Sequence, residues 1–160
     1  MGKILLVAGA LVATLMFGAA GAYFTGQAQV AENTIKAGTV AISTEPTSAA
    51  LSIDALAPGA TITKPLTVVN SGSLPVDYVV TAAKKSGITE FYEALTVRVV
   101  ADGAVVYEGE LSKLRTTPLT LAAGSRAQLQ FSVGIPAAAG NELAGDYTKI
   151  SLYVDAEQVH

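Results

Sequence analysis

The sequence predicts an all-β fold: an antiparallel β-sandwich of jelly-roll or immunoglobulin-like type, with short helical turns in its connections. Three observations predict it. About seven or eight short segments alternate apolar and polar residues, as half-buried strands do. Turns that contain Gly or Pro separate these segments. The segments together fill the length of one domain, and the absence of Trp and Cys excludes an antibody-type core.

The first half of the domain contains strands joined by turns. In residues 61–70, Pro65 cannot donate a backbone hydrogen bond, so this strand should lie at a sheet edge or contain a bulge there. Pro58 and Gly59 form the turn before it, because Pro fixes φ and Gly tolerates positive φ. The expected strands of this half are residues 39–43, 51–53, 61–70 and 75–83.

The second half begins with a helical break. Ser86 is placed to cap a short helix over residues 88–94, with Phe91 and Leu95 on one side. The dipeptide Asp102-Gly103 then favours a two-residue hairpin turn. The remaining expected elements are strands at residues 95–101, 104–108, 126–135 and 147–157, an extended stretch at 118–121, one helical turn at 111–114 and a loop at 136–146.

Residues 1–22 have the features of a secretory signal peptide that is cleaved. Lys3 precedes a long apolar run, and the run ends at Ala20 and Ala22, which form an A-x-A cleavage site before Tyr23. The run is close to the ~20 residues that cross a bilayer, so retention as a membrane anchor is an alternative. A buried soluble helix is a second alternative, and the lack of an amphipathic face argues against it.

Cleavage would expose residues 23–33 as an alternating strand at the new N-terminus. One face of this strand carries Phe24, Gly26, Ala28 and Val30. A strand outside a sheet exposes a row of unpaired N–H and C=O groups. It can pair within its own sandwich, formed by residues 34–160, or add to a neighbour's open sheet edge as a donor strand. The second pairing is head-to-tail, and such contacts grow filaments unless they close into a ring.

Composition narrows the classes of partner. The net charge of the chain is -3 at pH 7 and becomes -4 without Lys3, so a basic surface for nucleic acid is not expected. Cys is absent, so the fold has no disulfide and no thiol chemistry. Only 14% of the residues are charged, and a weakly charged surface tolerates close self-association. The expected partner is a second copy of the chain, and the membrane is met only through the uncleaved leader.

The sequence lacks the usual patterns of catalytic residues. The one His is His160, the last residue, and no H-E-x-x-H zinc motif occurs. A lone terminal His is also a poor member of a Ser-His-Asp triad, because no neighbouring residue orients it. No P-loop or dinucleotide fingerprint is present, and the aspartates do not have calcium-loop spacing. We therefore expect no catalytic residue, no metal site and no cofactor.

Several segments match, in order and spacing, those of a known family. They are GAYF at residues 21–24, NTIKAGTV at 33–40, LAPGATITK at 56–64, VNSGSLPV at 69–76, and LAG to ISLYVDAEQ at 143–158. Together they resemble the TasA/camelysin family over nearly the whole chain. The chain departs from the family in two ways: it lacks the long insertion between the later strands of the best-known fibre protein, and it differs just after the expected cleavage point.

This resemblance implies a secreted protein that is processed by a dedicated signal peptidase and assembles into extracellular fibres of biofilm matrices, a design shared by related archaeal bundling pilins. It also implies a jelly-roll-like sandwich whose N-terminal strand completes the next subunit. The expected function is therefore that of a structural filament subunit, with itself and a signal peptidase as partners and no reaction catalysed. The alternative is a monomeric cell-surface adhesin or binding module that keeps its first strand in its own sheet.

Overall fold

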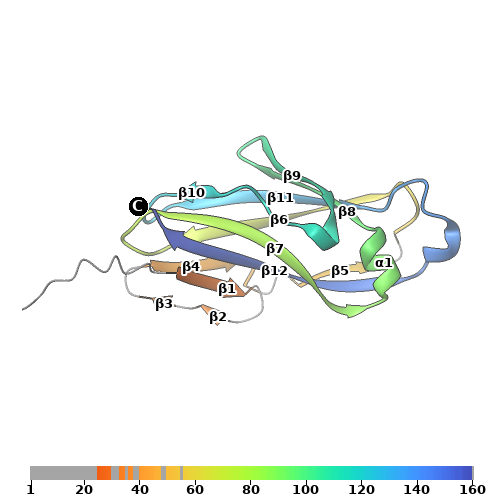
Figure 1. Cartoon of the computed structure of the whole chain (residues 1–160), viewed down its shortest axis with the longest axis horizontal. Helices are drawn as coiled ribbons and strands as arrows, with labels where there is room; N and C mark the ends of the chain where they lie inside the picture. The colour runs from red at the N-terminus through yellow and green to blue at the C-terminus, as the bar shows by residue number, and fades with distance from the viewer. Residues whose placement is uncertain are drawn as a thin grey trace, which may run out of the picture.

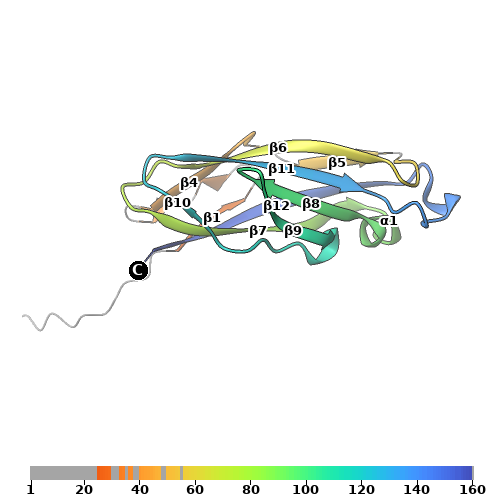
Figure 2. The same ribbon diagram turned by 90° about the horizontal axis from the view of Figure 1, so that it is seen from above.

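The computed structural model describes residues 25–29, 33–34, 36–37, 40–47, 50–54 and 56–159. Two six-stranded antiparallel sheets form an elongated sandwich (Figure 1, Figure 2). The prediction of an all-β sandwich is therefore confirmed. Strand β1 (Thr25–Gln29) lies in the half of the sandwich where the C-terminus is found, and helix α1 (Thr89–Ala94) lies at the opposite end (Figure 1).

The first sheet is built around the last strand of the chain. That last strand is β12 (Tyr147–Gln158). Besides β12 and β1, the sheet contains β2 (Asn33–Thr34), β5 (Ala50–Asp54), β7 (Val76–Gly87) and β10 (Leu119–Leu121). The order is β10-β7-β12-β1-β2, and β5 also pairs with β12. Pairing between β7 and β12 extends along almost the full length of both strands. β12 is thus the central strand of this sheet.

The second sheet contains the predicted proline edge. Its strands are β3 (Lys36–Ala37), β4 (Val40–Glu45), β6 (Thr61–Asn70), β8 (Thr96–Ala101), β9 (Ala104–Glu110) and β11 (Arg126–Gly134). The order is β3-β4-β6-β11-β8-β9. β4 pairs with β6 only at residues 67–70. At Pro65, β6 therefore has a described neighbour on one side, β11, and none on the side of β4. An edge position at Pro65 is therefore confirmed.

The inward faces of the two sheets form one apolar core. Alternation in residues 76–80 of β7, in residues 129–133 of β11 and in residues 152–156 of β12 places every second side chain in it, as the sequence predicts. Phe91 and Leu95, on the predicted side of the short helix, are also fully buried. The largest fully buried side chains are Tyr78, Phe91, Phe131, Ile42, Ile53, Leu66, Leu95, Leu111, Leu129, Ile150 and Leu152.

Two glycines allow the chain to turn closely. Asp102 has φ 49° and Gly103 has φ 82°, which is the positive-φ pair that the predicted hairpin turn requires. Gly87 has φ 105°, and a Cβ atom there would lie 2.6 Å from the Cα atom of Thr148. Only glycine fits this close approach, which brings the end of β7 against β12 before the chain enters α1.

Two local predictions are wrong. Ser86 does not cap α1: it lies in β7 opposite Lys149, and the N-cap residue is Ile88, which makes no side-chain cap bond. Alternation in the strand expected at residues 147–157 places Ser151 on the outward face, opposite to Ile150 and Leu152. It is buried instead, because strands flank it on both sides, at Ala50 in β5 and Ala83 in β7. Both differences follow from the central position of β12: pairing with β12 keeps Ser86 in β7, and the strands on either side of β12 cover Ser151.

One lateral side of the sandwich is bridged by the segment between the 3-10 turn η1 (Leu111–Lys113) and β10. Thr116 exchanges two bonds with Val80 of the first sheet: its N–H donates to the Val80 carbonyl (3.1 Å), and its Oγ1 accepts from the Val80 N–H (3.0 Å). The next N–H, of Thr117, donates to the Val106 carbonyl of the second sheet (3.2 Å). The segment therefore connects β7 to β9.

Asn70 connects two turns at the end of the sandwich away from α1. It is fully buried, and its Oδ1 accepts from the Gly72 N–H (3.0 Å). Its Nδ2 donates to the carbonyl groups of Leu74 (2.8 Å), Ala122 (3.2 Å) and Leu121 (3.3 Å). A buried amide that is satisfied on both of its atoms fixes the surrounding backbone. Asn70 thus holds the turn after β6 against the turn before β11.

Replacement Asn70→Ala should lower the free energy of unfolding by about 2–4 kcal/mol, because it removes the partners of buried backbone groups. Urea denaturation measures this. Ser71→Ala is the matched control: Ser71 is exposed, its hydroxyl makes one bond to the Ala41 carbonyl (3.3 Å), and its loss should cost less than about 0.5 kcal/mol. Equal losses in the two variants would show that Asn70 has no special role.

Tyr78 makes stability depend on alkaline pH. Burial, and secondly the negative charge of Asp102, raise the pKa of its phenol to about 12 from 10.0. The folded state therefore keeps the proton in a range where the unfolded chain has lost it. This contribution is complete below pH 10 and is lost as the pH rises from 10 to 12, by about 2–3 kcal/mol in total.

The variant Tyr78→Phe should remove that part of the pH dependence. The free energy of unfolding, measured in urea between pH 9 and pH 12, should fall less steeply for the variant than for the natural chain. Parallel curves for the two proteins would contradict the assignment of the alkaline transition to Tyr78.

Candidate assembly site

The candidate site is the edge of β12 that faces away from β7. Two strands share this edge. β5 pairs with residues 147–151 and β1 pairs with residues 153–157, both antiparallel. Leu152 lies between the two pairings. β1 thus covers the part of the edge that β5 leaves open, and with it β12 has a neighbour on both sides.

The register places the alternating positions of β1. Gly26 lies opposite Ala156 and Ala28 lies opposite Val154. Ala156 and Val154 are buried in the core. Directly opposite residues of an antiparallel pair share a face of the sheet, so Gly26 and Ala28 occupy register positions on the core face. Their role as donor-strand residues stays a prediction.

The other predicted site residues lie outside the described residues. They are Ala20, Ala22 and Tyr23 of the cleavage site and Phe24 and Val30 of the donor strand. The boundary between a leader at 1–22 and a strand at 23–33 is likewise untested and stays a prediction.

β1 pairs with β12 of its own chain. The sequence left two pairings open, one within the chain and one between chains, and the single chain adopts the first. After β1 the chain reverses, because β2 pairs antiparallel with β1 at Ala28↔Thr34 and Gln29↔Asn33. The N-terminal strand thus has a place in its own sheet. We call the edge of β12 at residues 153–157 the seat, and the first strand of the same chain fills it.

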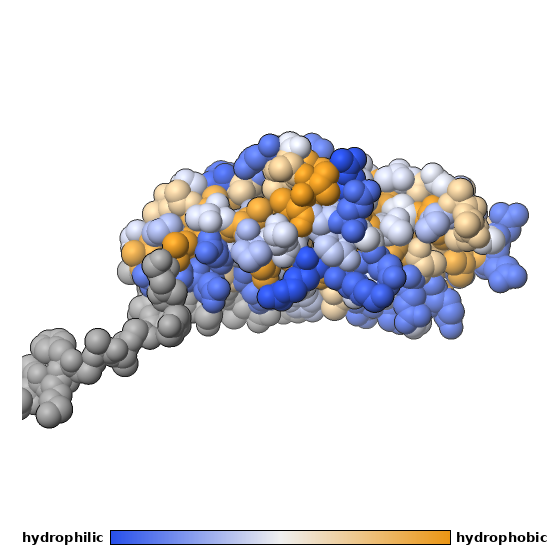
Figure 3. All heavy atoms as spheres, turned by 45° about the horizontal axis from the view of Figure 1, so that its top comes forward, coloured by the Kyte–Doolittle hydropathy of each residue, from blue (hydrophilic) through white to orange (hydrophobic). Residues whose placement is uncertain are grey.

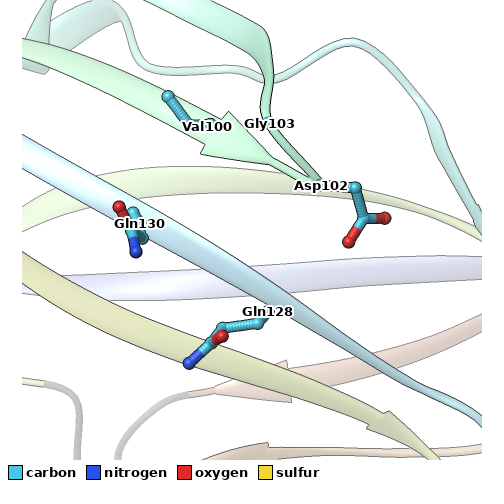
Figure 4. A pocket seen from close by; sticks show the side chains of 5 residues that line it. All are labelled: Val100, Asp102, Gly103, Gln128 and Gln130. Carbon is cyan, nitrogen blue, oxygen red and sulfur yellow. The ribbon is translucent and has the colours of Figure 1, made fainter.

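The outer face of the second sheet carries two shallow hollows. One has a volume of about 230 Å³ and is lined by Val100, Asp102, Gly103, Gln128 and Gln130 (Figure 4). Figure 4 shows these side chains spread along β8, β11 and the hairpin turn, with no point on which they converge. The second hollow, of about 450 Å³, includes Arg98 and Glu108, whose side chains are 4.0 Å apart. Ser132 also lines the second hollow, and its hydroxyl lies 3.0 Å from the Thr63 hydroxyl, while the Glu108 carboxylate faces Arg98.

The family model of camelysin metallo-endopeptidases matches residues 2–142 of the 160-residue chain. The chain belongs to the camelysin family. The resemblance read from the sequence motifs is thereby confirmed.

Two solved structures are similar to this camelysin-family chain. A crystal structure of FLHE has 13% identity and a TM-score of 0.40, over 86% of this chain and 98% of that chain. A structure of infectious bursal disease virus, Gx strain, has 12% identity and a TM-score of 0.38, over 86% of this chain and 32% of that chain. At these TM-scores neither likeness carries an argument about function. No curated protein matches the chain.

The family description names a metal-dependent peptidase, and the described residues do not fit a metal. A catalytic zinc takes about three protein ligands. In the described part of the camelysin-family chain, no group of three or more His, Cys, Asp or Glu residues could hold a metal ion. His160 lies outside the described residues. No hydrolytic step follows from this arrangement. Within the same part of the chain, no helix is long and apolar enough to cross a membrane.

The sequence patterns do not reveal the structural positions of three residues. Asn70 stands at the end of the expected strand at residues 61–70, and the structure buries it and bonds its side chain. Ile88 and Tyr147 are exposed, and they meet at the α1 end, where the Ile88 N–H donates to the Tyr147 carbonyl (3.0 Å). The contact between them depends on the pairing of β7 with β12, which is distant in sequence.

Proposed function

We propose that the chain is the structural subunit of a secreted, extracellular filament, and that it catalyses no reaction. In this filament, β1 of one copy fills the seat on β12 of the next copy. The observation that carries the proposal is the seat itself. Its occupant is a short strand at the N-terminal edge of the described chain, and it completes the sheet beyond the end of β5.

The same seat can accept the same strand from a second copy. An exchanged strand makes the same backbone hydrogen bonds and meets the same core positions, Val154 and Ala156, so only the connecting segment changes course. Pairing within the chain is favoured when the chain is dilute, and pairing between chains gains as local concentration rises. The intramolecular arrangement is thus the closed form of an exchangeable strand.

Each exchange is head-to-tail, since one copy gives β1 and offers its own β12 edge to another. Contacts of this kind extend into a filament unless the rotation between copies closes a ring. The leader at residues 1–22 would hold the strand at the membrane until a signal peptidase releases it, which would confine assembly to the outside of the cell. Membership of the camelysin family supports export and assembly of this kind.

The alternative is a monomeric surface module that keeps β1 in its own sheet, and the intramolecular pairing with β12 is the observation in its favour. The two functions differ in the contact between β1 and β12. In the monomeric module this contact lies within one chain, and in the filament it joins two chains.

Cysteine pairing distinguishes them. Gln27 lies directly opposite Asp155, and opposite residues in antiparallel strands have Cα atoms about 4.5–5.5 Å apart, which suits a disulfide. The natural chain has no Cys. Gln27→Cys and Asp155→Cys are placed on separate chains, co-expressed and exported with the natural leader. The expected result is a disulfide between the two variants, identified by mass spectrometry of the linked peptides.

The control replaces Asp155→Cys with Lys149→Cys, which lies opposite Ser52 of β5. No bond to Gln27→Cys should form there. The contradicting outcome is a disulfide between Gln27→Cys and Asp155→Cys that forms only when both substitutions are in one chain, and never between separate chains. In that case β1 pairs with β12 of its own chain. The filament proposal is then wrong and the monomeric module is supported.

Deletion of residues 23–31 behind an intact leader should give a folded domain that forms no filaments, because the donor strand is gone while the core of both sheets remains. Electron microscopy of negatively stained protein reads out assembly, and circular dichroism reads out folding. Filaments formed by the shortened chain would count against the role of β1.

A further inference from the structure

The α1 end carries an exposed apolar pair that no described residue covers. Ile88 is 39% exposed and Tyr147 is 46% exposed, and the two are joined by the backbone bond from Ile88 to Tyr147. The third large apolar residue with comparable exposure is Val105, 44% exposed, on the β8–β9 hairpin. Figure 3 shows apolar side chains at the surface both on the flank of the sandwich and at its α1 end.

The opposite end presents two uncharged turns beside the exposed ion pair of Arg126 and Glu45. The turns are residues 71–75 and 122–125, which Asn70 holds together through its bonds to Leu74 and Ala122. None of the residues in these two turns is charged, and Ser, Gly, Ala, Leu and Pro make up both. Most of them are exposed. Interface centres are depleted of charge, so these turns can be buried with little cost of dehydration.

The direction of β1 determines which end of one copy meets which end of the next. β1 runs antiparallel to β12, so it points from the C-terminal end of β12 toward Tyr147 and α1. In the single chain, β2 turns the chain back, and β4 begins beside Asn70, to which Ile42 is opposite. An exchanged strand has no need of that reversal, because its own body lies elsewhere.

The connecting segment is long enough to pass the α1 end. From Gln29 to Val40 the chain has a reach of up to about 36 Å when extended, once β2 and β3 give up their pairings with β1 and β4. The edge of β12 from Tyr153 to Tyr147 measures about 20 Å at the same rise per residue. A donor whose β1 is seated can therefore place its Val40, and with it its Asn70 end, just beyond the α1 end of the acceptor.

We infer that the α1 end of each copy, centred on Ile88 and Tyr147, packs against the uncharged turns at the Asn70 end of the copy that donates β1 to it. The inference rests on the proposed strand exchange and identifies the second contact of the same junction. The occupant of this surface is a second copy of the chain. The strand fixes the order of the copies, and the end-to-end contact fixes their orientation.

The apolar pair is flanked by charges of both signs. Glu90 and Asp146 are acidic, Lys85 and Lys149 are basic and exposed, and Lys84 is engaged with the Gly87 carbonyl (3.3 Å) and the Thr89 hydroxyl (2.6 Å). The direction of β1, and not charge, therefore favours the head-to-tail contact over one between two α1 ends.

The test is the double variant Ile88→Thr, Tyr147→Thr, with Val105→Thr as the matched control. Each replaces exposed apolar area without entering the core. After export with the natural leader, the concentration needed for assembly, measured by sedimentation, should rise at least about tenfold for the double variant and stay within about twofold for the control. The melting temperature of the unassembled chains should be unchanged.

A photo-crosslinking residue at position 147 tests the contact directly. In assembled protein, p-benzoylphenylalanine at Tyr147 should form adducts with residues 71–75 or 122–125 of a neighbouring copy, located by mass spectrometry. Adducts elsewhere, or equal assembly of the double variant and the Val105 control, would overturn the inference while the Gln27–Asp155 disulfide still forms between chains. If that disulfide does not form between chains, the proposed function fails first.

Discussion

Every strand of a sheet has two edges of N–H and C=O groups that need partners. In this protein, the two edges of β12 determine the arrangement of β7, β5 and β1. β12 supplies a continuous row of core side chains, including Ile150, Leu152 and Val154, so it must stay in register at the centre of its sheet. β7 satisfies one edge along almost its whole length. The other edge is divided between β5 and β1, and β5 ends before the strand does. A short separate strand is therefore built into the requirement for a complete sheet.

A strand from the same chain and the same strand from a second copy would complete the sheet equally well. Within the described residues, the contact consists of five residues of backbone pairing, Thr25 to Gln29 against β12. A copy of the same segment supplies the same groups, which is why a closed monomer and an open chain of subunits are related by one change of connection. The weakly charged surface lowers the cost of either arrangement. In the proposed assembly, regulation would fall to whatever controls the freedom of the first strand, and the leader predicted at residues 1–22 is the candidate for that role.

Periodicity made the faces of the strands predictable and left their edges open. The alternation in β6, β7, β11 and β12 identified the buried residues, and the turn chemistry of Asp102-Gly103 located the hairpin, because both are local properties of the chain. Which strand lies beside which is set by contacts distant in sequence. The division of the β12 edge between β5 and β1, the burial of Ser151 and the failure of Ser86 as a cap all follow from that pairing.

The candidate site shows the same division. The donor-strand role of Gly26 and Ala28 stays a prediction, and the pairing of β1 with its own chain could not be chosen from periodicity. Asn70 was recognisable as a turn residue, but its four bonded backbone groups come from two turns that are far apart in sequence. Family membership gave the class of protein, and the geometry of β12 gave the mechanism proposed for it.

The segment that joins Val80 to Val106 has a consequence for the shape of any assembly. It bridges the two sheets along β7 and β9, on the side of the sandwich away from β1. In the proposed strand exchange, each copy would give one strand and accept one, so copies joined in this way would form a filament without branches. Thickening of such a filament would require lateral contacts of a different chemical kind.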